Sequence, residues 1–201
     1  MSDRELIAIL RGVKPEEAVE VASLLVEAGF SKIEVPLNSP EPIRSIGLIV
    51  DAFGDKALIG AGTVLTIAQV EAVASTGAKL VVSPNANSAV IARTRELGMS
   101  SYPGVLTPTE CFSALEAGAN GLKLFPADIL GAGGVKAICA VLPTETQLYA
   151  VGGVTTDNLQ AWRNAGILGF GIGSSLYKPG IAMRDLQQRA EQLVSAYDAL
   201  V

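Results

Sequence analysis

The sequence predicts an α/β protein in which eight parallel strands close into a (β/α)8 TIM barrel, in a single domain over residues 1–201. Short apolar segments rich in β-branched residues alternate with helical segments along the whole chain, most of them starting about 25 residues after the last. Eight such units without a dinucleotide-binding fingerprint favour a closed barrel over a doubly wound open sheet, which has the same local pattern. No linker or low-complexity segment divides the 201 residues.

The expected strands are short apolar segments bounded by glycine, proline or polar residues. In chain order they are Leu6–Leu10, Lys32–Leu37, Leu58–Val64, Leu80–Pro84, Ser101–Leu106, Gly121–Pro126, Gln147–Val154 and Gly169–Ser175. Helices such as Pro15–Ala28 and Ile67–Ser75 lie between them, with Pro15 and Thr66 as start signals. Several helices are expected to end at glycine, which readily adopts the left-handed conformation of a helix C-terminus. These glycines are Gly29, Gly77, Gly98, Gly118 and Gly166.

Composition excludes several classes of function. A net charge of −5 argues against nucleic-acid binding, and the absence of histidine removes Ser-His and Cys-His mechanisms and His-ligated metal sites. The two cysteines, Cys111 and Cys139, are expected to be small buried hydrophobic residues. No apolar run reaches the roughly 18 residues of a membrane helix, and the charged start Met1–Glu5 lacks the apolar core of a signal peptide. A soluble cytoplasmic protein is therefore expected.

Two charged residues lie inside expected strands, where burial makes charge costly. Glu34 lies between Ile33 and Val35, and Lys123 is flanked by leucines in the same way. Because side chains alternate between the two faces of a strand, Glu34 and Lys123 are predicted to point into the barrel. Arg11 and Thr63 end the first and third strands, so all four residues are expected near the C-terminal face, where barrel enzymes keep their sites.

A buried lysine beside a carboxylate has two interpretations. It forms a structural ion pair, which often adds little net stability. Alternatively, burial makes the amine of Lys123 easier to deprotonate, so that it attacks a ketone and forms a Schiff base. The protonated imine is an electron sink that allows a neighbouring carbon–carbon bond to break, with Glu34 moving the protons.

Two neighbouring strands end in glycine-rich sequences, Val151–Val154 and Gly171–Ser175. Glycine allows a ligand to approach the backbone, and the loops after the seventh and eighth strands of these barrels recurrently bind phosphate. Tight strand-to-helix turns also require glycine and are the alternative. The pair of glycine-rich ends favours a phosphate site.

Together these sequences resemble the Schiff-base 2-keto-3-deoxy-6-phospho-sugar-acid aldolases, the KDPG/KHG class I aldolase family. The matching segments are collinear over essentially the whole chain. They are Ile33–Ser39, Gly60–Val64, Ser83–Asn85, Pro103-Gly104, Leu122–Pro126, Gly152–Val154 and Gly173-Ser174. The resemblance implies a homotrimeric barrel without metal or organic cofactor. Its substrate is a phosphorylated six-carbon keto acid, which it cleaves to pyruvate and glyceraldehyde 3-phosphate.

The resemblance also implies roles for individual residues. Lys123 becomes the imine-forming lysine, Glu34 the proton carrier, and Thr63 part of the pyruvate end. The phosphate would be held by Gly152, Gly153, Gly173 and Ser174.

Two departures indicate the galactonate-type branch of the family. The gluconate-type branch has an arginine at the position of Asn38, whereas this chain has Arg11 to bind the pyruvate carboxylate. Val151 stands where the gluconate-type branch tends to carry threonine, which bears on the configuration of the substrate at C4. The gluconate epimer is the alternative substrate. A sugar-phosphate isomerase or epimerase and a non-catalytic sensor of phosphorylated ligands are the competing classes.

Overall fold

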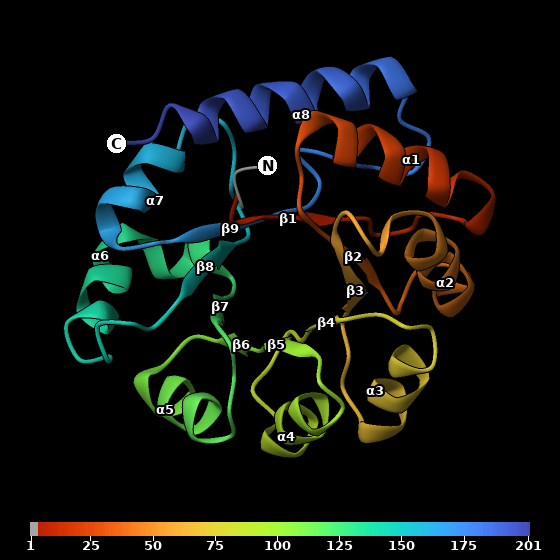
Figure 1. Ribbon diagram of the computed structural model, residues 1–201. Coiled ribbons are helices and arrows are strands. Elements are labelled where there is room, and N and C mark those ends of the chain that lie inside the picture. The colour runs from red at the N-terminus through yellow and green to blue at the C-terminus, as the bar shows by residue number, and fades with distance from the viewer. Residues whose placement is uncertain (1–3) are drawn as a thin grey trace.

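Parallel strands form a nearly closed barrel with helices around it in the computed structural model, which describes residues 4–201 (Figure 1). Met1–Asp3, part of the segment used to argue against a signal peptide, lie outside the described residues. The elements in chain order are β1 (Leu6–Ile9), α1 (Pro15–Ala28), β2 (Lys32–Pro36), α2 (Pro42–Phe53), β3 (Leu58–Gly62), α3 (Ile67–Ala74), β4 (Leu80–Val82), α4 (Ser88–Glu96), β5 (Ser100–Tyr102), β6 (Gly104–Val105), α5 (Pro108–Glu116), β7 (Leu122–Leu124), α6 (Ala127–Cys139), β8 (Leu148–Val151), α7 (Leu159–Ala165), β9 (Gly169–Ile172) and α8 (Met183–Asp198).

Strand pairing confirms the barrel and excludes the open sheet. The first strand, β1, pairs in parallel with β2 on one side and with the last strand, β9, on the other. The hydrogen-bonded strand order is β5-β4-β3-β2-β1-β9-β8-β7-β6. Its two ends, β5 and β6, are consecutive in the chain. Ser83 donates its backbone N–H to Tyr102, and Lys123 donates to Pro103, so residues 100–105 connect β4 to β7. The predicted fifth strand is therefore present but interrupted at Pro103, which has no N–H to donate.

Most of the predicted helix signals are confirmed. Thr66 caps α3 by accepting a hydrogen bond from the backbone N–H of Gln69, and α1 begins at Pro15. Gly29 and Gly166 end α1 and α7 with φ of 107° and 108°. The structure ends the seventh and eighth strands earlier than predicted, at Val151 and Ile172. The glycines that follow therefore lie in loops, which the strand periodicity did not show.

A polar network closes the N-terminal end of the barrel interior. Lys32 Nζ lies 3.0 Å from Glu5 Oε2, and the Tyr149 hydroxyl donates a hydrogen bond to the same carboxylate. The Tyr149 ring packs edge-to-face on Tyr102, with ring centroids 5.0 Å apart. Lys32 was expected only to begin a strand, but its side chain is buried, on the same face of β2 as Glu34. This structural ion pair fills the N-terminal end of the barrel interior, so a ligand would have to bind at the C-terminal end.

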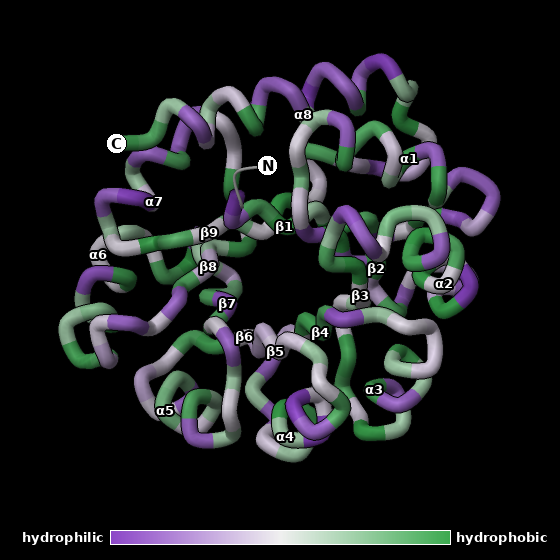
Figure 2. Tube along the Cα trace, viewed as in Figure 1, coloured by the Kyte–Doolittle hydropathy of each residue, from purple (hydrophilic) through white to green (hydrophobic). Residues whose placement is uncertain are grey.

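The hydrophobic core lies between the strands and the helices that cover them (Figure 2). The outer helices alternate hydrophilic and hydrophobic residues, as expected for helices with one face on a sheet. Within residues 4–201, no helix is long and apolar enough to cross a membrane. Cys111 is buried as predicted, but the same expectation is wrong for Cys139, which is partly exposed near the end of α6. There its thiol lies 3.6 Å from the Ala165 carbonyl oxygen.

Close packing inside the barrel predicts opposite effects for two glycine-to-alanine substitutions. A Cβ atom at Gly60 of β3 would lie 1.8 Å from the Leu80 carbonyl oxygen, whereas one at Gly47 in α2 meets nothing within 4 Å. We expect Gly60→Ala to lower the free energy of unfolding by about 3 kcal/mol or more. Gly47→Ala, the matched control, should raise it by about 0.5–1 kcal/mol. Urea unfolding of both variants measures this, and equal effects would contradict the packing described.

Candidate active site

Glu34 and Lys123 point into the barrel from β2 and β7, as strand alternation predicts. Their side chains are buried, with residue exposures of 2% and 7%. Their chain neighbours, such as Ile33 and Leu122, belong to the outer core between strands and helices. The alternation that places apolar residues against the helices therefore places these two charges inside the barrel.

The Glu34 carboxylate rests directly against the backbone of β3. A Cβ atom at Gly62 would overlap the Glu34 carboxylate oxygen, at 1.5 Å. Gly62 is therefore required for this position of the carboxylate. Thr63, the next residue, has a φ of 57°, a left-handed conformation that is unusual for threonine and turns the chain out of β3. The sequence showed a glycine-rich strand end here but not its contact with Glu34.

Glu34 and Lys123 influence one another without forming a direct ion pair. Within residues 4–201, neither side chain has an oppositely charged atom within 4.0 Å. By contrast, Lys32 and Glu5 form such an ion pair at the N-terminal end of the barrel. Oε2 of Glu34 is buried and has no hydrogen-bond partner among the described residues. Lys32 and Glu5 therefore form a structural ion pair. Glu34 and Lys123 do not, so their polar groups are available for a ligand or a water molecule.

Burial shifts the pKa values of both groups toward neutrality. Desolvation raises the pKa of Glu34 to about 7, against the opposing effects of the Lys123 and Arg11 charges. Desolvation lowers the pKa of Lys123, and the Arg11 charge acts in the same direction, while Glu34 opposes it. A lysine held this way reaches its neutral, nucleophilic form more readily than an exposed one.

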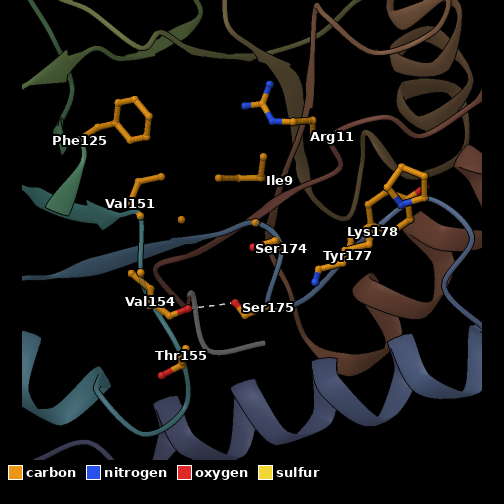
Figure 3. A pocket seen from close by; sticks show the side chains of 15 residues that line it. Ile9, Arg11, Phe125, Val151, Val154, Thr155, Ser174, Ser175, Tyr177 and Lys178 are labelled. Atoms are coloured by element: carbon orange, nitrogen blue, oxygen red, sulfur yellow. Dashed lines mark hydrogen bonds between the residues drawn. The ribbon is translucent and has the colours of Figure 1, made fainter. Parts of the chain in front are cut away.

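A cavity of about 390 Å³ opens at the C-terminal end of β1, β8 and β9 (Figure 3). Six of the residues predicted for the site line it: Arg11, Val151, Gly152, Gly153, Gly173 and Ser174. Lys123, Glu34 and Thr63 are not among the lining residues. Lys123 nevertheless adjoins the cavity, because its Nζ lies 4.6 Å from the centroid of the Phe125 ring, which forms part of the wall.

Arg11 connects this cavity to the buried pair. Its charge acts on both Glu34 and Lys123, and its Nη1 donates a 2.6 Å hydrogen bond to Oδ1 of Asn38, in the loop after β2. The next residue, Ser39, accepts a hydrogen bond from the backbone N–H of Gly12 at 2.9 Å. These contacts join the ends of β1 and β2 and fix the guanidinium. The contact between Asn38 and Arg11 was not predicted, because it depends on loop conformation.

The two glycine-rich ends meet on one wall of the cavity. Gly152 and Gly153 have φ of 104° and 69°, and both pack against Asp128 at the start of α6. The Ser175 hydroxyl donates a 2.9 Å hydrogen bond to the Val154 carbonyl oxygen, which connects the two loops (Figure 3). A Cβ atom at Gly173 would meet nothing within 4 Å. The sequence did not identify Ser175, Tyr177 and Lys178, which also line the cavity.

The fold and the site define a class: a parallel (β/α)8 barrel with a buried amine and a buried carboxyl group beneath a glycine-walled cavity. Comparison with known proteins then gives the family. The family model for KDPG and KHG aldolases matches residues 1–193, so the chain belongs to that aldolase family. The resemblance to this family that we found in the sequence is therefore confirmed.

Individual relatives are similar over nearly the whole chain. A protein of Rhizobium meliloti (strain 1021), named probable 2-dehydro-3-deoxy-6-phosphogalactonate aldolase, is 54% identical over 98% of this chain and 93% of its own. The 2-dehydro-3-deoxy-6-phosphogalactonate aldolase of Escherichia coli (strain K12) is 51% identical over 96% and 94%. A solved structure described as native KDPGal superposes with a TM-score of 0.96 at 49% identity, covering 98% of this chain and 96% of the other.

The raised pKa of Glu34 predicts a pH-dependent difference in stability between the protein and Glu34→Gln. Folding raises this pKa from 4.5 to about 7, so the protonated carboxyl favours the folded state at low pH and that contribution is lost as the pH rises through 7. Glutamine does not titrate. We therefore expect the free energy of unfolding of Glu34→Gln, relative to wild type, to increase by roughly 2–3 kcal/mol between pH 5 and pH 8.

Urea unfolding at the two pH values measures this difference. Glu20→Gln, which removes an exposed carboxylate from α1, is the matched control and should show little change with pH. A constant difference between wild type and Glu34→Gln would show that Glu34 ionises as an exposed carboxylate does.

Proposed function

We propose that the protein is a Schiff-base aldolase that cleaves 2-dehydro-3-deoxy-6-phosphogalactonate to pyruvate and glyceraldehyde 3-phosphate. The observation that carries this proposal is the position of Lys123, which is buried beside Glu34 and has no ion-pair partner among residues 4–201. It lies at the edge of a cavity that is lined by Arg11 and by glycines. Membership of an aldolase family and two relatives named for the galactonate substrate support it.

The proposed reaction begins at the ketone. Neutral Lys123 attacks C2 of the substrate, and the resulting carbinolamine loses water to form a protonated imine. Glu34 supplies and removes the protons, through a bound water where direct reach fails, because its pKa of about 7 suits both directions of transfer. The imine takes up electron density, so neither a metal ion nor an organic cofactor enters the proposed chemistry.

Carbon–carbon cleavage follows from the imine. Glu34 takes the proton of the C4 hydroxyl, the C3–C4 bond breaks, and its electrons pass into the imine to leave an enamine on Lys123. Glyceraldehyde 3-phosphate departs. Protonation of the enamine at C3 gives the imine of pyruvate, and water releases pyruvate and the free amine of Lys123.

The remaining residues orient the two ends of the substrate in this proposal. Arg11, held by Asn38, binds the carboxylate next to the reacting ketone, and Thr63 lies at the same end. The phosphate lies on the other side, against Gly152, Gly153, Gly173 and Ser174, three of which are glycines whose backbone a ligand can approach closely.

We also propose the homotrimer implied by the resemblance and the cytoplasmic location expected from the sequence. Apolar side chains exposed by 40% or more on and beside α3, α5 and α6 support association with further copies. They are Leu65, Ile67, Phe112, Ile129 and Val141. Native mass spectrometry distinguishes a trimer of the 20.7 kDa chain from a monomer or a dimer.

The position of Lys123 predicts where pyruvate will be trapped by borohydride. Intact mass and peptide mapping should find a reduced pyruvyl adduct on Lys123, because the imine between pyruvate and this amine is an intermediate of the reverse reaction. Lys123→Ala should give no adduct and lose about 10³-fold or more in kcat. Lys136→Ala, an exposed lysine of α6, is the control and should behave as wild type. An adduct mapped to another lysine would remove Lys123 from its role.

Val151 predicts the preference between the C4 epimers. Its side chain lines the cavity and cannot hydrogen-bond a substrate hydroxyl, whereas threonine at the same site can. We expect Val151→Thr to raise kcat/KM for the gluconate epimer relative to the galactonate epimer by about 10-fold. Val154→Thr, the same substitution on the far side of the double glycine, should leave the ratio unchanged. An unchanged ratio in Val151→Thr would place the determinant of C4 configuration elsewhere.

A further inference from the structure

The charges that line the cavity are both positive. Of the residues that form its wall, Arg11 and Lys178 carry charge, and none is acidic. Arg11 acts on Glu34 and Lys123 and is bonded to Asn38, so it belongs to the end of the cavity near the buried pair. Lys178 follows β9 on the same segment as Gly173 and Ser174. Figure 3 shows its side chain on the side of the cavity opposite Phe125 and Val151.

Lys178 lies between two residues that fix the backbone of its loop. On one side, the hydroxyl of Tyr177 donates a 2.9 Å hydrogen bond to Glu17 of α1. On the other side, Pro179 packs so closely on Gly12 that a Cβ atom there would lie 2.7 Å from its ring. The first contact attaches the segment to α1, and the second attaches it to the loop that carries Arg11. The base of Lys178 is therefore held in place while its side chain remains exposed.

The ammonium group of Lys178 has no acidic partner in the described part of the chain. No carboxylate in residues 4–201 lies within 4.0 Å of its Nζ, whereas other cations such as Arg4, Lys32 and Arg93 have acidic partners. An unpaired cation on the wall of a cavity without acidic residues attracts anions, and a phosphate dianion more strongly than a monoanion.

We infer that Lys178 is the cation that binds the phosphate group of the substrate and gives the site its selectivity for phosphorylated aldehydes. The inference rests on the proposed function. A substrate with a carboxylate at one end and a phosphate at the other meets a separate cation at each end, Arg11 and Lys178. The glycine-rich loops shape the phosphate site, but of the residues they contribute to the wall, Gly152–Thr155 and Gly173–Ser175, none carries a positive charge.

The test compares Lys178→Met and Lys178→Arg with wild type in the condensation of pyruvate with an aldehyde. Glyceraldehyde 3-phosphate and unphosphorylated glyceraldehyde serve as acceptors. We expect Lys178→Met to raise the KM for glyceraldehyde 3-phosphate about 10-fold or more and to lower the preference for the phosphorylated acceptor by the same factor. The KM for pyruvate and the borohydride adduct should not change. Lys178→Arg should restore most of the preference.

Lys79→Met removes an exposed lysine before β4, at the opposite end of the barrel, and is the matched control. Calorimetric titration with inorganic phosphate provides a readout that requires no turnover, and Lys178→Met should weaken this binding by a similar factor. An unchanged acceptor preference and unchanged phosphate affinity in Lys178→Met would overturn the inference. Absence of a pyruvyl adduct from wild type, with phosphate binding that still depends on Lys178, would reject the aldolase mechanism and retain the anion site.

Discussion

The site depends on the burial of an amine and a carboxyl group side by side, without a direct ion pair between them. A closed salt bridge would hold Lys123 protonated and Glu34 ionised, because each charge would stabilise the other. Here desolvation outweighs that attraction and moves both pKa values toward neutrality. In the proposed mechanism, these two groups exchange protons with the substrate.

The two ends of the barrel interior are filled differently, and this difference makes the arrangement possible. At the N-terminal end, Tyr149, Tyr102 and the Lys32–Glu5 pair fill the interior with large side chains. At the C-terminal end, glycines on β3 and after β8 and β9 leave space, first for the Glu34 carboxylate beside Gly62 and then for a ligand. A larger side chain at Gly62 would occupy the position of the Glu34 carboxyl group, which is the proton carrier in the proposed mechanism. In the proposed mechanism, stability and catalysis therefore depend on opposite ends of the same strands.

Sequence periodicity predicted those parts of the molecule that follow from regular geometry. The eight βα units and the inward direction of Glu34 and Lys123 follow from repeated strands and from alternation along each strand. The break at Pro103, the bond from Arg11 to Asn38 and the place of Lys178 on the cavity wall depend instead on the paths of individual loops. Lys32 shows a different limit. A lysine at the start of a strand is ordinarily exposed, but here its charge is paired with Glu5, which immediately precedes the neighbouring strand β1.

Arg11 connects substrate binding to proton transfer in the proposed mechanism. Its positive charge lowers the pKa of Glu34 and also lowers that of Lys123, which favours the neutral amine that attacks the ketone. When the substrate carboxylate neutralises this guanidinium, the opposing effect on Glu34 weakens, so Glu34 becomes a stronger base. That change occurs when Glu34 must accept protons from the carbinolamine and from the C4 hydroxyl. In this mechanism, the contact that orients the keto acid therefore also prepares the Glu34 carboxylate for catalysis.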